Sequence, residues 1–379
     1  MLQDLQFSPA LFFDLLLPVI VFPSGFNMRR KKFFRNITTI MKFGFVATIF
    51  CFAIYSGALY GFHKGGMLTK FDHKTNEYVQ LNLDMYQILS VCSLLCSSDV
   101  IAAISMISYT DQPKLFSIVY GEGVFNDIVS IIMFNTVKNV FEKNNFDYST
   151  PIEIAVSFIL LALYSVLIGL ATGIFSSVLF KKMRFLTHSA VTETCLLFII
   201  ALLTYFISEY AEQSGMISLL TSGITMAHYT WYNLSPQGKT MTSVSFSIFG
   251  AFAEAFVFTY IGLCVFTYAN DPTIDDQPHI WSVSFIGWMC FIVIVGRFIG
   301  VWLAHFLFRL CQKKPDISIR ELCFITYGGM IRGAIAFGLV LKIDPKDTKN
   351  FPEREVVVTT TLALVIITTL VFGTFMKMA

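Results

Sequence analysis

The stretch Ile118-Val-Tyr-Gly-Glu-Gly-Val-Phe-Asn-Asp-Ile-Val-Ser-Ile-Ile-Met-Phe134 decides the fold. It predicts an apolar helix that crosses a bilayer, yet it carries Glu122 and the adjacent pair Asn126-Asp127. An ionisable residue near the bilayer midplane costs roughly 2.5–3.5 kcal/mol, so such residues face a partner or a water-filled cavity and mark ion and proton paths. The alternative is a carboxylate that an arginine neutralises for structural reasons, and Glu122 has a candidate partner for that role.

The composition predicts a polytopic membrane protein. Of the 379 residues, 55% are hydrophobic and 14% are charged, and the mean hydropathy is +0.67. Soluble domains carry about 25% charged residues. The net charge of +2 gives no reason to expect nucleic-acid binding. The eight cysteines show no zinc-type CxxC spacing, and we expect buried thiols.

Apolar segments of about 20 residues are the unit to count. We find eleven such segments, at roughly 8–28, 37–62, 85–108, 115–137, 151–180, 190–208, 214–229, 241–269, 280–308, 321–342 and 354–376. Together they predict an all-α membrane protein without a soluble domain. Basic clusters follow the first, fifth and ninth segments, at Arg29–Lys32 with Arg35, at Lys181, Lys182 and Arg184, and at Lys313, Lys314 and Arg320. By the positive-inside rule the N-terminus is outside and the C-terminus is cytoplasmic, or on the matrix side in a mitochondrion.

Five predicted spans carry a charge near their middles: Asp99, Asp127, Glu254, Arg297 and Arg332. A purely structural bundle does not require charges at a common depth, whereas a transporter that binds its substrate at the midplane does.

Two of these spans also contain helix-interrupting sequence. Ser97-Ser98-Asp99 can divert backbone groups from the helix ladder, and Tyr327-Gly-Gly-Met-Ile-Arg-Gly333 places three glycines around Arg332. Broken helices expose carbonyl ends that coordinate cations, while a positive helix end or an arginine offsets nearby carboxylates. The alternative interpretation is that the glycines allow close helix packing.

The predicted mechanism follows from Asp127. In a partly dehydrated cavity a single carboxylate is a site for which proton and cation compete. Its neighbour Asn126 adds no charge, so we expect one proton to exchange for one monovalent cation. Na⁺ or K⁺ takes oxygen ligands, for which we nominate Asp127, Asp99, Asn126 and Ser98 with freed backbone carbonyls. No nucleophile elbow, histidine cluster or metal motif predicts an enzyme, and no cofactor is expected.

These residues resemble the monovalent cation/proton antiporters of the sodium/proton exchanger type. Tyr120-Gly-Glu-Gly-Val-Phe-Asn-Asp127 resembles the F-G-E-[SG]-x-x-N-D signature, and Gly329–Phe337 resembles G-G-L-R-G-A-[IV]-A-F. The opening Leu16–Met28 resembles L-L-P-P-I-I-F-x-x-G-[FY]. Asp111–Gly123 and Met226–Leu234 are closest to the plant vacuolar and endosomal branch.

The resemblance implies a fold and roles for the residues. The fold is an inverted repeat with two broken crossing helices, with an incomplete first repeat at 8–137, a linking helix at 151–180 and a second repeat at 190–376. Asp127 would be the transport carboxylate and Glu122 with Arg297 a stabilising pair between core helices. Arg332 would lie in or beside the second broken helix, and Glu254 would be the acid of the tenth family helix.

The resemblance also implies electroneutral Na⁺(K⁺)/H⁺ exchange by an elevator-like movement, normally in a homodimer. It favours an endomembrane (vacuole or endosome) and is compatible with the plasma or inner mitochondrial membrane. Three features depart from the family pattern: this sequence lacks the first two of the usual thirteen helices, and Val100 and Pro23 replace usual motif residues. A transport-inactive homologue within a larger membrane complex is therefore the alternative.

Overall fold

The computed structural model describes residues 10–28, 30–72, 77–107, 111–143, 150–182, 189–270, 281–311, 317–343, 351 and 353–376. Within these residues the chain is almost entirely helical and forms two compact units. Arg29, Arg184, Lys313 and Lys314 of the predicted cytoplasmic loops lie outside the described residues.

The first unit contains Lys31–Asn145 and Ile261–Ala379. Its helices are α2 (Arg30–Arg35), α3 (Ile37–Met41), α4 (Thr48–Lys64), α5 (Met85–Leu94), α6 (Ile101–Met106), α7 (Pro113–Lys143), α12 (Val283–Cys311), α13 (Ile319–Gly328), α14 (Ala334–Leu341) and α15 (Arg354–Phe375). A π-helical segment, Lys42–Ala47, joins α3 to α4, so that Ile37–Lys64 is one continuous span.

The second unit contains Phe7–Arg30 and Phe146–Tyr260. Its elements are a π-helical segment (Leu11–Leu16), α1 (Leu17–Phe26), α8 (Thr150–Lys182), α9 (Ala190–Tyr210), α10 (Gly215–Tyr229), a 3-10 turn (Thr230–Asn233) and most of α11 (Pro236–Asn270), whose last turns belong to the first unit. Helix α10 packs against α8, α1 and α9. Glycines permit these close approaches, since a Cβ at Gly25 would lie 2.7 Å from the carbonyl oxygen of Leu220.

Seven described helices are long and apolar enough to cross a membrane: Ile37–Lys64, Pro113–Phe141, Ala155–Lys182, Ala190–Tyr210, Pro236–Phe266, Val283–Leu310 and Arg354–Phe375. The other four predicted segments correspond to the shorter apolar run Leu11–Phe26, to α10, and to two pairs of short helices, α5 with α6 and α13 with α14. Multi-pass membrane architecture and two interrupted helices are therefore present, whereas the count of eleven full spans has only loose support.

Both interrupted helices begin with capping interactions. The sequence Ser318-Ile-Arg-Glu321 forms a capping box at α13, in which Ser318 Oγ accepts from the Glu321 amide at 3.3 Å and Glu321 Oε2 accepts from the Ser318 amide at 2.7 Å. At α5, Gln87 Oε1 accepts a bond from the Asp84 amide at 3.3 Å. The capping interactions fix the first turn of each helix, and the interrupting residues that follow explain why each helix then breaks.

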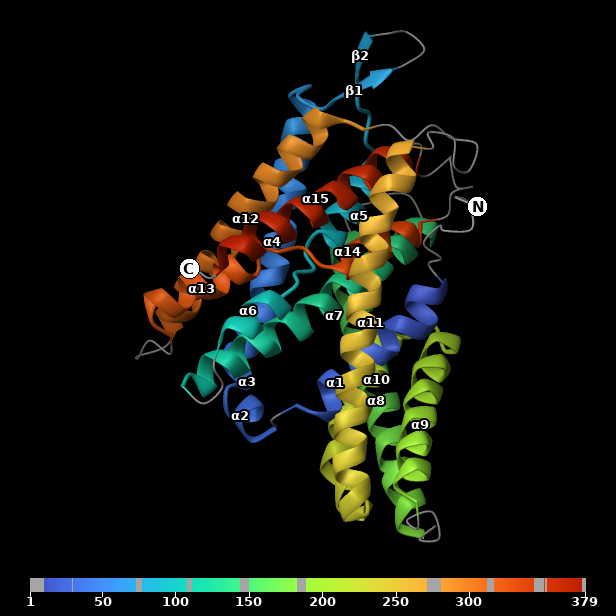
Figure 1. Ribbon diagram of the computed structural model, residues 1–379. Coiled ribbons are helices and arrows are strands. Elements are labelled where there is room, and N and C mark those ends of the chain that lie inside the picture. The colour runs from blue at the N-terminus through green and yellow to red at the C-terminus, as the bar shows by residue number, and fades with distance from the viewer. Residues whose placement is uncertain are drawn as a thin grey trace. The chain divides into compact units, whose positions relative to one another are not determined.

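A short hairpin, β1 (Thr69–Asp72) with β2 (Glu77–Gln80), follows α4 and pairs antiparallel. In Figure 1 it lies at one end of α4 and α12. Ser282 Oγ donates to the Thr69 carbonyl at 2.6 Å, and Lys70 forms an ion pair with Glu353 at 2.5 Å. The hairpin therefore ties together the ends of α12 and α15 in the first unit.

Candidate ion-binding site

The two interrupted helices meet at their breaks. The Asp99 amide in the first break donates to the Ile331 carbonyl in the second at 2.8 Å. A Cβ at Gly333 would lie only 3.1 Å from the Cβ of Asp99, so glycine permits this approach. The predicted breaks at Ser97-Ser98-Asp99 and around Arg332 are therefore both present, between Leu94 and Ile101 and between Gly328 and Ala334.

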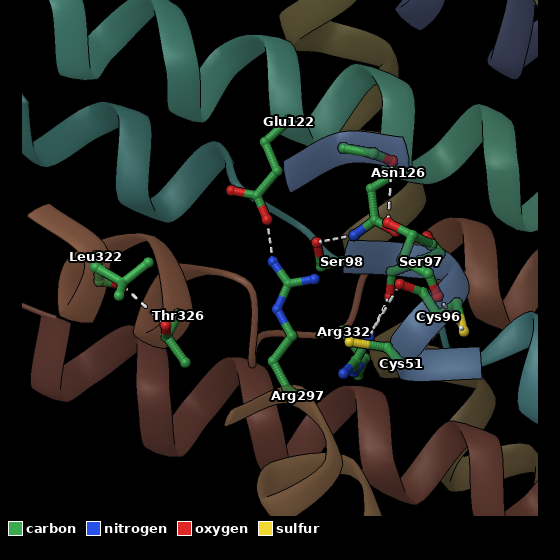
Figure 2. Close-up of polar contacts among 12 residues, drawn as sticks. Cys51, Cys96, Ser97, Ser98, Glu122, Asn126, Arg297, Leu322, Thr326 and Arg332 are labelled. Atoms are coloured by element: carbon green, nitrogen blue, oxygen red, sulfur yellow. Dashed lines mark hydrogen bonds and ion pairs between the residues drawn. The ribbon is translucent and has the colours of Figure 1, made fainter. Parts of the chain in front are cut away.

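Arg332 joins the second break to the end of α5. Its side chain is fully buried, and Nη1 donates to the carbonyls of Cys96 at 3.2 Å and Ser97 at 2.9 Å, as Figure 2 shows. Nη2 donates to Tyr55 Oη at 2.8 Å. Carbonyls at a helix C-terminus lack helical partners and carry partial negative charge. Arg332 thus supplies both donors and positive charge to the carbonyl end of α5.

Asp127 lies on α7 beside the first break. Ser97 Oγ donates to its Oδ1 at 2.6 Å, and its side chain is half-buried. A hydrogen bond to an ionised group contributes about 1.5–3 kcal/mol, so this bond favours the ionised carboxylate. The residue as a whole is neither fully enclosed nor fully exposed.

Asn126 is fully buried and its amide is fixed at both ends. Nδ2 donates to Ser98 Oγ at 2.5 Å, and Oδ1 accepts from Thr48 Oγ1 at 3.1 Å. The two consecutive α7 residues therefore bind two consecutive serines of the broken helix, drawn in part in Figure 2. This pairing fixes the rotation of α7 relative to the first break.

Glu122 and Arg297 form an ion pair between α7 and α12, as Figure 2 shows. Both side chains are only 1% exposed. The guanidinium also lies against Gly329 at the start of the second break, where an added Cβ would overlap it. The pair thus connects three elements of the first unit, and the stabilising role that the resemblance implies for it stays a prediction.

The structure brings together seven of the eight nominated residues within the first unit: Ser98, Asp99, Glu122, Asn126, Asp127, Arg297 and Arg332. Glu254 lies on α11 in the second unit, so its place in a charge network stays a prediction.

Sequence reasoning missed the roles of Ser97, Thr48 and Tyr55. The sequence indicates Ser97 only as a helix-interrupting residue, yet Ser97 donates directly to Asp127. Thr48 and Tyr55 belong to the predicted apolar span 37–62, and in the structure they contact Asn126 and Arg332, respectively. The available signal was a hydroxyl inside a long apolar segment, which is also consistent with bonding to the helix's own backbone.

The transmembrane family described as "Sodium/hydrogen exchanger, transmembrane" matches residues 2–379. Sodium/hydrogen exchanger 1 of Arabidopsis thaliana is 31% identical over 376 residues, which are 98% of this chain and 67% of that protein. Sodium/hydrogen exchanger 2 of the same plant is 30% identical over 377 residues, at 98% and 66% coverage.

Sodium/hydrogen exchanger 8 of Homo sapiens is 29% identical over 375 residues, which are 98% of this chain and 60% of the human protein. The chain thus spans about two thirds or less of the length of these relatives. The solved structure of the sodium proton antiporter MjNhaP1 from Methanocaldococcus jannaschii aligns with a TM-score of 0.67 at 15% identity, over 97% of this chain and 83% of that one. That likeness supports the antiporter fold. Because the family match extends over essentially the whole sequence, the chain belongs to the sodium/hydrogen exchanger family.

Proposed function

We propose that the chain is an electroneutral antiporter that exchanges one Na⁺ or K⁺ for one proton at Asp127. The observation that carries the proposal is a half-buried carboxylate on the long helix α7, held by a serine of a broken helix. Family membership makes cation/proton exchange the activity to test. Because the relatives are named sodium/hydrogen exchangers, Na⁺ is the first cation to test.

The site chemistry supports competition between proton and cation. Ser97 Oγ can donate to the ionised carboxylate and would also remain bonded to a neutral acid, because a hydroxyl both donates and accepts. A cation that displaces the proton finds carboxylate oxygens at Asp127 and a hydroxyl at Ser98 nearby. The carbonyls of Cys96 and Ser97 already accept from Arg332, so we assign the main ligand role to side chains, Asp99 included.

Electroneutrality follows from the neighbour of the carboxylate. Asn126 is a neutral amide with partners at both ends, so the protein adds one negative charge at this position of α7. One carboxylate carries either one proton or one monovalent cation, and the loaded site has the same net charge in both cases.

Alternating access requires the site to move or its surroundings to rearrange. The two breaks, α7, Arg332 and the Glu122–Arg297 pair all belong to one compact unit and are joined by hydrogen bonds and an ion pair. This supports an elevator-like movement in which the site travels as one body. Assembly as a homodimer and residence in an endomembrane are further parts of the proposal.

The test is cation-driven proton flux in proteoliposomes that contain the purified full chain. Na⁺ and K⁺ are supplied separately, and flux is measured with the membrane potential clamped at different values. We expect exchange that is independent of voltage, that is abolished by Asp127→Asn, and that is retained by Glu212→Gln, a control at an exposed carboxylate in the second unit. Folded wild-type protein that is silent with both cations would overturn the proposal.

A further inference from the structure

The first unit contains a basic cavity whose lining includes none of the residues of the candidate ion-binding site. Its volume is about 480 Å³. Its lining residues come from α2, α3 and the start of α7: Lys32, Arg35, Asn36, Thr38, Thr39, Pro113 and Lys114. Three of the seven are cationic and none is acidic, so the cavity favours an anionic occupant.

The cavity lies where two predicted membrane spans begin. Ile37 starts the span that contains α4, and Pro113 starts the span formed by α7. Residues at the first turn of a span lie near the membrane surface. The N-terminus of α7, a helix of 31 residues, adds the positive end of its dipole to the same wall.

The size and chemistry of the cavity specify the class of ligand. Small-molecule sites commonly enclose about 300–1,000 Å³, and 480 Å³ is within this range. Arginine and lysine bind phosphate oxygens through charge-assisted hydrogen bonds. Asn36, Thr38 and Thr39 provide polar side chains for the remainder of a polyol headgroup.

We propose that this cavity binds a phosphate group carried by an anionic molecule at the membrane surface, a phosphoinositide-type headgroup or its soluble counterpart. Basic pockets between spans on the cytoplasmic side of a membrane bind such headgroups, and the positive-inside rule assigns this loop to that side.

The cavity contacts the helix that carries Asp127. Phe33 on α2 stacks on Phe125 of α7, with ring centroids 6.2 Å apart and planes at 13°. Phe125 directly precedes Asn126 in the sequence. On α3, Ile40 fills the space beside Gly121, where an added Cβ would lie 2.7 Å from it. An occupant that orders α2 therefore acts on the face of α7 that carries Gly121 and Phe125, while Asp127 lies on another face of the same helix, toward the first break.

The experiment measures binding to the purified full chain in detergent micelles. Native mass spectrometry with phosphatidylinositol 4-phosphate tests the lipid source, and calorimetry with inositol 1,4-bisphosphate and inorganic phosphate tests the soluble source. The test variant is the double substitution Lys32→Gln/Arg35→Gln. The matched control, Lys181→Gln/Lys182→Gln, removes the same charge from the exposed end of α8, outside the cavity.

We expect one lipid headgroup to bind, and the test variant to bind it about 25-fold more weakly, since each basic side chain near the surface contributes about a factor of five. The control is expected to retain wild-type affinity, and Asp127→Asn is expected to bind normally, which separates this site from transport. Binding of the soluble phosphates with similar affinity would assign the free anion as ligand. No binding of any probe, or equal losses in the test and control variants, would overturn the proposal.

Discussion

The Glu122–Arg297 pair yields a quantitative prediction about stability. Both side chains are 1% exposed. Among the residues that the structure describes, Glu122 Oε2 and Arg297 Nε have no hydrogen-bond partner. The pair is thus buried with only part of its hydrogen-bonding capacity used, so the desolvation of both charges is incompletely offset.

Removing one partner leaves the other charge buried and unpaired, which typically costs 3–5 kcal/mol. Glu122→Met and Arg297→Met are each expected to destabilise the chain by about this amount. The double variant removes both charges, and exchange of a buried pair for apolar side chains is typically neutral or stabilising by about 1–4 kcal/mol. We therefore expect the double variant to be at least as stable as wild type, with a large favourable coupling between the sites.

The assay is thermal unfolding of the purified protein in detergent, followed by tryptophan fluorescence. For a chain of 379 residues, a loss of 3–5 kcal/mol corresponds to a fall in Tm of roughly 4–6 °C. Losses below about 1 kcal/mol in the single variants would be those of a solvated pair and would refute the reasoning. So would a double variant whose loss equals the sum of the two single losses.

Two further substitutions test individual contacts. Ser97→Ala removes the donor to Asp127. Because a hydroxyl bonds an ionised carboxylate more strongly than a neutral acid, by roughly 1–1.5 kcal/mol, the acid limb of the exchange–pH profile should move about 1 unit to higher pH. An unchanged profile would show that the bond does not tune proton release. Gly123→Ala forces a Cβ into Val100 and should destabilise by about 1–3 kcal/mol, with rescue by adding Val100→Ala. Gly57→Ala in α4, where an added Cβ meets nothing within 4 Å, is its control, and equal losses at both glycines would refute the packing argument.

The broken helices could be predicted from the sequence because their causes are local. Consecutive Ser97, Ser98 and Asp99 compete with the helix for backbone bonds, and the glycines around Arg332 weaken the second helix. The first break extends from Leu95 to Val100, which agrees with the predicted position. The predicted apolar segments also coincide with helices, because a bilayer requires internally bonded backbone.

The pairing of side chains could not be predicted in the same way. Ser97 and Ser98 are adjacent and chemically identical, and the backbone twist in the break decides which of them meets Asp127 and which meets Asn126. The sequence nominated Ser98 as an ion ligand, whereas Ser97 makes the direct bond to the carboxylate. Tyr55 is separated from Arg332 by more than half the chain, so only tertiary structure reveals their contact.

The bond between the Asp99 amide and the Ile331 carbonyl has a consequence for how this site tolerates mutation. Both atoms belong to the main chain, so the link between the two breaks survives almost any exchange of side chain at either position. The side chain at residue 99 can therefore change while the two interrupted helices remain joined. Proline is the exception at residue 99, the donor of this bond, because proline has no amide hydrogen to donate.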